Sequence, residues 1–229
     1  MKYQAIEHRL PGFLRRHILH FESAIDDSLV SFSAALSPDA RVLDAGAGER
    51  VHAKYFQGCQ YVAIDLAVGD ASWDYGKLDA VADLNALPFR EASFDACINV
   101  VTLEHVREPG CVLGEIERTL RPGGRLLLVV PHEWEVHQSP HDYYRYTRHG
   151  VAYLLKKAGF AEFDIQPVGG YFRLISRRLL NGLQFFGGPF FFVAALFLAP
   201  PALVLPWFDS LDRDRNFTLG YICTARKRS

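Results

Sequence analysis

Short apolar runs alternate with amphipathic stretches along most of the chain, beginning at Arg41. Several runs are apolar on both faces, which is typical of parallel strands buried between layers of helices. Before them, apolar residues recur at helical spacing over residues 12–36 and predict a helix that ends before a Ser-Pro-Asp break. Five candidate strands follow, with the sequences ARVLDAG, QYVAIDL, AVADL, FDACINV and GRLLLVVP.

The second half of the chain continues this alternation. Helical periodicity over residues 108–120 ends at an Arg-Pro-Gly-Gly turn, and another helix is predicted over residues 150–158. Residues 160–168 and 221–225 have the character of a sixth and a seventh strand. This order predicts an α/β fold: a doubly wound, mostly parallel, seven-stranded Rossmann-like sheet with helices on both faces.

The composition narrows the class of protein. Apolar residues make up 49% of the 229-residue chain and charged residues 22%, which suffices for a full core. The net charge of -1 provides no basic excess for phosphates, so we expect no nucleic-acid partner. Four scattered cysteines and a charged N-terminal stretch without a signal-peptide run favour a cytoplasmic protein. We expect an N-terminal helical cap at 1–39 and one domain at 40–229.

A glycine loop directly follows the first predicted strand. Gly46 and Gly48 let the backbone approach a ligand closely, and the helix expected after them would offer unpaired N–H groups. Asp65 and Asp83 close the next two strands, where carboxylates can accept from ribose hydroxyls and from an adenine amino group. Val51 occupies the third glycine position of the dinucleotide fingerprint, which disfavours a pyrophosphate. An adenosine ligand without phosphates remains, and S-adenosylmethionine is the common one.

These segments resemble a known family. VLDAGAG, YVAID, DLNALPF, SFDACINVVTLEHV and LRPGG, within residues 40–166, are similar in order and spacing to the class I S-adenosylmethionine-dependent methyltransferases, in particular the type-11 small-molecule set. The resemblance implies that Asp44 lies near the amino group of the cofactor. Arg50 departs from the family, which often has a small residue there. The residues implied to bind the cofactor are Asp44, Ala45, Gly46, Gly48, Asp65, Leu66, Asp83, Leu84, Asn99 and Val100.

A polar loop rich in histidine and tyrosine follows the fifth strand, over residues 131–147. It is expected at the carboxyl edge of the sheet, where open α/β sheets bind ligands. The spacing of its three histidines matches no helical metal-ligand pair, and we predict no metal site. Methyl transfer requires a general base only when the acceptor is a hydroxyl, and His132 and His137 are the candidates for that base.

Two groups of residues near this loop have two interpretations each. Glu104 and His105 either form a polar wall of the substrate site or begin a helix. Tyr143, Tyr144 and Tyr146 either shape the acceptor site and face the sulfonium, or pack in the core.

An apolar insertion is expected at about 179–208, before the last strand. The 30 residues from Leu179 to Phe208 carry no charge. Prolines leave Phe190–Ala199 as the longest uninterrupted helix, about 15 Å long and half the hydrocarbon thickness of a bilayer. If the last strand returns to the sheet, both ends of the insertion lie on one side of any membrane, which excludes a single crossing.

We therefore predict that several phenylalanines in residues 185–208 are exposed and contact the cytoplasmic membrane face peripherally. Arg173, Arg177 and Arg178 would add salt-sensitive contacts with anionic headgroups. A lid buried within the protein and an oligomer interface are the alternatives.

The function that these features favour is methyl transfer from S-adenosylmethionine to a small or lipid-linked sugar or envelope acceptor, with O-methylation preferred. One alternative is a catalytically inactive methyltransferase-fold protein that acts as a membrane-associated partner. A nucleoside-binding oxidoreductase is a third interpretation, which Val51 opposes.

Overall fold

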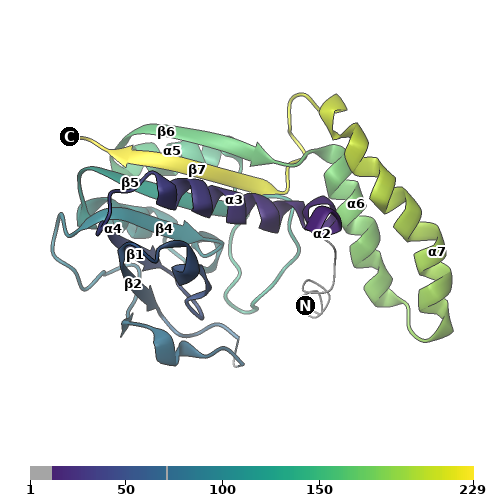
Figure 1. Ribbon diagram of the computed structural model, residues 1–229, viewed down its shortest axis with the longest axis horizontal. Helices are drawn as coiled ribbons and strands as arrows, with labels where there is room; N and C mark the ends of the chain where they lie inside the picture. The colour runs from purple at the N-terminus through teal and green to yellow at the C-terminus, as the bar shows by residue number, and fades with distance from the viewer. Residues whose placement is uncertain (1–11, 71) are drawn as a thin grey trace. The chain divides into compact units, whose positions relative to one another are not determined.

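The computed structural model describes residues 12–70 and 72–229 and contains a seven-stranded sheet in the order β3-β2-β1-β4-β5-β7-β6 (Figure 1). Strands β1, β2, β3, β4 and β5 pair in parallel, whereas β7 runs opposite to its neighbours (Figure 1). The predicted doubly wound, mostly parallel sheet is therefore confirmed. The strands are β1 Arg41–Ala45, β2 Gln60–Asp65, β3 Ala80–Val81, β4 Phe94–Val100, β5 Leu120–Pro131, β6 Phe160–Val168 and β7 Gly220–Lys227.

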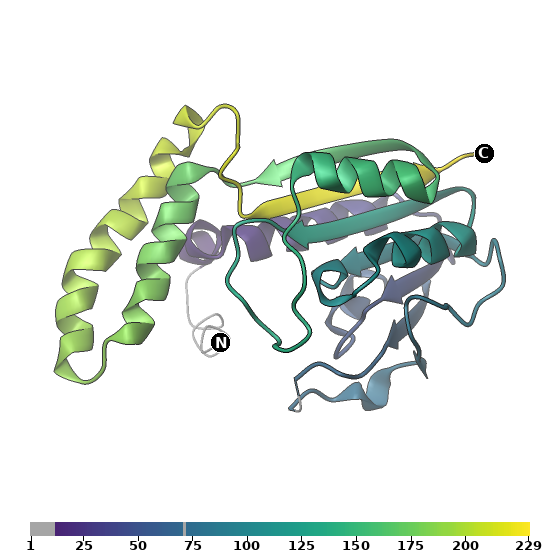
Figure 2. The same ribbon diagram turned by 180° about the vertical axis from the view of Figure 1, so that it is seen from behind.

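Helices cover both faces of this sheet. Helices α4 and α5 lie on one face, and residues 27–34 of α3 lie on the other (Figures 1 and 2). Leu113 and Ile116 of α4 are fully buried against β5, where Leu126 and Leu128 are equally buried. The α-helices are α2 Gly12–Ile18, α3 His20–Ala34, α4 Pro109–Thr119, α5 Arg148–Ala158, α6 Tyr171–Gly182 and α7 Pro189–Val204.

Two helices in the structure differ from those predicted from the sequence. The helix expected over 12–36 is interrupted at Leu19, which separates α2 from α3. The helix expected after the glycine loop is a single 3-10 helix, Val51–Tyr55. The crossover from β1 to β2 therefore places no α-helix N-terminus beside the loop.

The chain forms two compact units. One contains the described residues up to 26 together with 167–220, and the other contains 27–166 together with 221–229. Helices α6 and α7, which lie between β6 and β7 in the sequence, group with α2 and the first residues of α3. The division expected from the sequence stays a prediction.

Within the first unit, α6 and α7 lie side by side as an antiparallel pair (Figures 1 and 2). The Ser176 hydroxyl donates to the Ala202 carbonyl at 2.5 Å, which joins the two helices. Arg177 makes a two-pronged ion pair with Glu22, at 2.9 and 3.1 Å. Arg173 pairs with Asp209 at 3.4 Å. Carboxylates therefore hold the guanidinium groups of Arg173 and Arg177 within the protein, and their role in headgroup binding stays a prediction.

Helix α7 continues through Pro200 and Pro201, contrary to the predicted end at Ala199. The two prolines remove the N–H donors for the carbonyls of Leu196 and Phe197, both of which are exposed, and packing along α6 keeps the helix direction. With the following 3-10 helix Leu205–Leu211, α7 gives an apolar helical segment of 23 residues. By length and composition alone, this segment is sufficient to cross a bilayer.

The exposure predicted for the phenylalanines is confirmed. Phe185, Phe190, Phe192 and Phe197 are each at least 70% exposed, and only 17% of the most apolar window of Pro189–Leu211 is buried. The α6–α7 hairpin thus presents a long apolar surface, named here the α7 surface, made by residues 185–208.

Candidate functional site

The glycine loop follows β1, at the point where the order of strands in the sheet reverses. The chain passes from β1 to β2 and β3 on one side and then returns to β4 on the other side. In open α/β sheets, ligands bind outside the carboxyl ends of the strands at this position. The carboxyl end of β1 carries Asp44, and that of β4 carries Asn99 and Val100.

The loop backbone is held tightly from both sides. Gly46 has a φ of +94°, and a Cβ added there would lie 2.6 Å from Thr102 Oγ1 and even closer to the Thr102 methyl group. Gly48 has a φ of +50°, and a Cβ there would lie 3.2 Å from the indole ring of Trp73. Both positions therefore require glycine, for conformation and for space.

The N–H groups of this loop are used inside the protein. Gly46 and Ala47 donate to the Ile64 carbonyl at 2.9 Å, and Gly48 donates to Asp65 Oδ2 at 2.9 Å. The loop therefore lacks the row of unpaired N–H groups that cradles a phosphate in dinucleotide and P-loop sites. A nucleoside ligand without phosphates suits this backbone better.

Two buried polar side chains at the strand ends keep an oxygen without a hydrogen-bond partner. Asn99 donates through Nδ2 to the Ala45 carbonyl at 2.7 Å, while its Oδ1 has no partner. Asp44 accepts from the Tyr61 hydroxyl through Oδ2, while its Oδ1 has no partner. Burial raises the pKa of Asp44 to about 7, although the Tyr61 hydrogen bond acts in the opposite direction. Unpartnered oxygens in buried positions are costly, and a ligand that donates to them would satisfy both.

The remaining predicted cofactor residues lie around the same edge of the sheet. Asp65 ends β2, and its two carboxylate oxygens accept from the N–H groups of Gly48 and Ala67. Asp83 is exposed and accepts from Asn85, whereas Leu84 is buried. Leu66 is 46% exposed, whereas Val100 is buried, with 8% of its surface exposed.

Arg50, the departure from the family pattern, is directed toward the β2–β3 side. Its guanidinium donates to the Lys77 carbonyl at 3.0 Å and lies 3.7 Å from Asp79. The Arg50 backbone has a φ of +63°. The arginine side chain is thus tied to residues 77–79.

The loop over residues 132–147 is organised by Arg145, which the sequence did not single out. Its guanidinium binds both carboxylate oxygens of Asp142, at 2.6 and 2.8 Å, and also donates to the carbonyls of Trp134 and Glu135. This ion pair lowers the pKa of Asp142 to about 2. A single arginine therefore joins the two ends of the loop.

The tyrosines fasten this loop to the segment that follows β4. The hydroxyl of Tyr146 donates to the Leu103 carbonyl at 2.7 Å, and that of Tyr144 donates to the Arg107 carbonyl at 2.8 Å. The N–H groups of Tyr143 and Tyr144 both donate to the Glu104 carbonyl. Tyr146 is buried in the core, so the packing interpretation applies to it.

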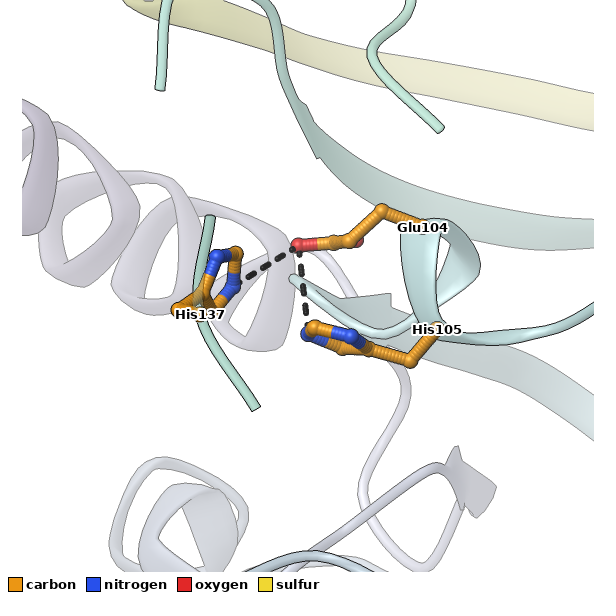
Figure 3. A group of neighbouring side chains, drawn as sticks. All are labelled: Glu104, His105 and His137. Atoms are coloured by element: carbon orange, nitrogen blue, oxygen red, sulfur yellow. Dashed lines mark ion pairs between the residues drawn. The ribbon is translucent and has the colours of Figure 1, made fainter. Parts of the chain in front are cut away.

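Glu104, His105 and His137 come together from two loops (Figure 3). Glu104 Oε1 lies 3.7 Å from His105 Nε2 and 3.6 Å from His137 Nε2, and the two rings meet edge to face with centroids 4.7 Å apart. Burial lowers the pKa of His137, but the Glu104 and Asp142 carboxylates and the Glu135 carbonyl outweigh it and raise the pKa above its ordinary value. Glu104 and His105 belong to a 3-10 helix, so both interpretations from the sequence describe them.

His132, the other candidate base, lies apart from this cluster at the end of β5. Its Nδ1 is 2.8 Å from the Tyr146 carbonyl. Because a carbonyl only accepts, Nδ1 carries the proton and Nε2 holds the lone pair. Its ring also lies 5.8 Å from that of Tyr221. The predicted bases His132 and His137 are therefore differently placed, one beside β7 and the other against Glu104.

Comparison with known proteins agrees with this geometry. Residues 43–128 match the family model described as a methyltransferase domain. Demethylmenaquinone methyltransferase from Renibacterium salmoninarum is 35% identical over 108 residues, which is 44% of this chain and 45% of that protein. Malonyl-[acyl-carrier protein] O-methyltransferase from Hahella chejuensis is 30% identical over 115 residues, or 46% of this chain and 41% of that protein. The chain thus spans less than half the length of these relatives.

A solved structure extends the similarity over the whole chain. The 1,6-didemethyltoxoflavin-N1-methyltransferase of Burkholderia thailandensis, solved with S-adenosylhomocysteine, has a TM-score of 0.55 and 21% identity, covering 100% of this chain and 90% of that one. At this identity the likeness shows the fold. Residues 43–128 thus match a methyltransferase domain, and the chain has the fold of a solved S-adenosylmethionine-dependent methyltransferase.

S-adenosylmethionine is the cofactor expected from the sequence, and the residues present fit it. The buried oxygens of Asp44 and Asn99 lack donors, and the cofactor carries an amino group and ribose and adenine donors. The glycine loop offers close approach without a phosphate cradle. The sequence-based assignment of each single contact stays a prediction.

The glycine loop can be tested with a matched pair of alanine variants. Gly46→Ala would strain a left-handed backbone and collide with Thr102, whereas a Cβ at Gly58 meets no atom within 4 Å. We expect Gly46→Ala to weaken S-adenosylhomocysteine binding roughly ten- to hundredfold, and Gly58→Ala to leave it unchanged. Titration calorimetry measures both, with circular dichroism as the check on folding. Equal affinities in the two folded variants would show that the loop does not touch the cofactor.

The raised pKa of Asp44 gives a pH test of its contact with the cofactor. If the ionised carboxylate holds the cofactor's ammonium group, a pKa of about 7 leaves it mostly protonated at pH 6 and mostly ionised at pH 8. We expect S-adenosylhomocysteine affinity to rise roughly tenfold between these pH values, and Asp44→Asn to lose that rise. A parallel pH dependence in Asp44→Asn would contradict the assignment.

Proposed function

We propose that this protein transfers the methyl group of S-adenosylmethionine to an oxygen of a small acceptor that resides in a membrane. The cofactor edge of the sheet supports the methyl transfer. The orientation of His132 supports an oxygen acceptor, and the α7 surface supports a membrane-borne one. Two relatives named above act on demethylmenaquinone and on malonyl-[acyl-carrier protein], as their names state, and the first of these agrees with a small-molecule acceptor.

Methyl transfer from a sulfonium is an in-line displacement, so most of the rate enhancement comes from positioning. The cofactor supplies the activated methyl group when bound. The glycine loop, Asp44 and Asn99 hold it at the carboxyl ends of β1 and β4. The loop over 132–147, fixed by Arg145, borders the same edge of the sheet and supplies the candidate acceptor contacts.

His132 is the general base in this proposal. The Tyr146 carbonyl fixes the neutral tautomer that keeps a lone pair on Nε2, which is the form that accepts a hydroxyl proton. As the methyl group is transferred, the acceptor oxygen loses its proton to this nitrogen. His137 is less suited, because its Nε2 faces Glu104 at 3.6 Å.

The acceptor's location follows from the α7 surface. Burial would stabilise each phenylalanine that is at least 70% exposed by on the order of 1.5–3 kcal/mol. The boundary between the headgroups and the acyl chains of a membrane offers that burial. The hairpin leaves from β6 and the chain returns to β7, which lies between β5 and β6 in the sheet. Both ends of the hairpin therefore lie on one side of a membrane. The four cysteines are free, consistent with the cytoplasmic face.

The base can be tested by His132→Gln, which keeps a polar side chain but removes the basic nitrogen. We expect methyl transfer to fall roughly 10²- to 10⁴-fold while S-adenosylhomocysteine affinity is unchanged. The assay follows tritiated methyl groups from S-adenosylmethionine into a bacterial lipid extract. His149→Gln, on the exposed side of α5, is the matched control. Full activity in His132→Gln would remove the base from the account.

Membrane contact can be tested by flotation with vesicles of phosphatidylethanolamine and phosphatidylglycerol. Because Arg173 and Arg177 are paired within the protein, we expect binding to persist in 1 M salt, where the Debye length is about 3 Å. The triple variant Phe190→Ser, Phe192→Ser, Phe197→Ser should bind at least about a hundredfold more weakly. Tyr153→Ser, an exposed aromatic of α5, is the control.

Two outcomes would contradict the membrane proposal. A wild-type protein that stays monodisperse without detergent and does not bind the vesicles would have its phenylalanines covered by protein. A stable oligomer that ignores the vesicles would assign the α7 surface to a contact between copies of the chain.

A further inference from the structure

A buried carboxylate in the second unit has no hydrogen-bond partner. Glu104 is 0% exposed, and neither of its oxygens, Oε1 and Oε2, is bonded to a donor. A buried carboxylate in this condition is strongly unfavourable unless a cation lies beside it. The nearest nitrogens that the structure gives for it, His105 Nε2 and His137 Nε2, lie at 3.7 and 3.6 Å, beyond hydrogen-bond distance, and they too are buried without a partner.

The other nitrogen of each histidine ring, Nδ1, faces a backbone carbonyl. His105 Nδ1 lies 2.6 Å from the His141 carbonyl, and His137 Nδ1 lies 3.1 Å from the Glu135 carbonyl. Both carbonyls accept, so in the neutral form of each ring Nδ1 carries the proton and Nε2 presents a lone pair. Histidines that bind metals are held in this way, with the non-ligating nitrogen donating to a carbonyl or carboxylate.

We propose that Glu104, His105 and His137 bind one divalent transition-metal cation, of the Zn²⁺, Mn²⁺ or Fe²⁺ kind. The three ligand atoms converge on one point and lie within 4.8 Å of one another (Figure 3). Ligands of a tetrahedral Zn²⁺ lie roughly 3.3 Å apart, so small side-chain rotations close the site. Two imidazoles and a carboxylate select such an ion over Mg²⁺ or Ca²⁺, which prefer oxygen ligands.

The surroundings of this set are fixed by other pairs. Asp142 lies 3.6 Å from His137 Nδ1, but its carboxylate is bound on both oxygens by Arg145, so it supports the histidine without being a ligand. The N–H groups of Tyr143 and Tyr144 hold the Glu104 backbone. The site is therefore built on two loops that are joined to each other.

The absence of a metal site predicted from the sequence rested on the loop histidines alone. His132 and His141 lie outside the cluster. Two of the proposed ligands come from the segment after β4, which the spacing of histidines within one loop does not include. The proposed site departs from that prediction because it draws on two segments.

Such a site deepens the proposed function, on which this step rests. Three protein ligands leave coordination positions open, and a metal there would bind an oxygen of the acceptor and favour its deprotonated form. The acceptor class that suits this is one with two neighbouring oxygens, such as a diol, an enediol or a hydroxy acid, because it can chelate the ion.

The test uses the full-length protein, freed of metal by chelation, with Zn²⁺ and Co²⁺ as the probes. We expect one Zn²⁺ per chain by equilibrium dialysis and a Co²⁺ absorption spectrum typical of nitrogen and oxygen ligands. His137→Gln should weaken Zn²⁺ binding at least about a hundredfold. His149→Gln, an exposed histidine of α5, and His132→Gln should bind as the wild type does.

Each outcome bears on the proposal. Failure of the wild type to bind Zn²⁺ stoichiometrically, or wild-type binding by folded His137→Gln, would overturn it. Because Glu104→Gln alters a fully buried side chain, His105→Gln is the second ligand variant, and circular dichroism confirms folding of each. His132→Gln separates this proposal from the proposed function. If His132→Gln still binds Zn²⁺ but loses methyl transfer, both proposals are supported. If His132→Gln loses methyl transfer and the wild type binds no Zn²⁺, only the metal proposal is overturned.

Discussion

The segment between β4 and α4, residues 101–108, is held between two loops, and the arrangement of the site depends on that contact. On one side Thr102 packs against Gly46, where no side chain fits. On the other side the Tyr146 hydroxyl donates to Leu103, and the N–H groups of Tyr143 and Tyr144 donate to Glu104. A change in this segment would displace the glycine loop and the loop over 132–147 together.

This contact explains why polar groups that are far apart in sequence act as one site. Asp44 and Asn99 reach the cofactor edge because β1 and β4 are neighbours in the sheet. Glu104 and His137 meet because Arg145 closes the loop over 132–147 onto itself, and the tyrosines fasten it to the segment after β4. The direct ion pair between Arg145 and Asp142 helps to keep the loop over 132–147 in one arrangement.

The fold could be predicted because strand periodicity and the glycine loop are local properties of the sequence. The strand order, the position of Asp44 and the return of the last strand to the sheet all agree with it. The sequence argument failed where local rules compete with packing. Pro200 and Pro201 do not end α7, because α6 supports it, and only a 3-10 helix follows the glycine loop. Arg145, Trp73 and the Glu104–His105–His137 cluster could not be predicted, because each acts through a contact between distant segments.

The most direct test of the account is calorimetric titration of the full chain with S-adenosylhomocysteine and, separately, with NAD⁺. We expect stoichiometric binding of S-adenosylhomocysteine, because the oxygens of Asp44 and Asn99 lack donors. We expect no binding of NAD⁺, because the N–H groups of the glycine loop are used inside the protein and form no phosphate cradle. Binding of NAD⁺ without binding of S-adenosylhomocysteine would contradict the account.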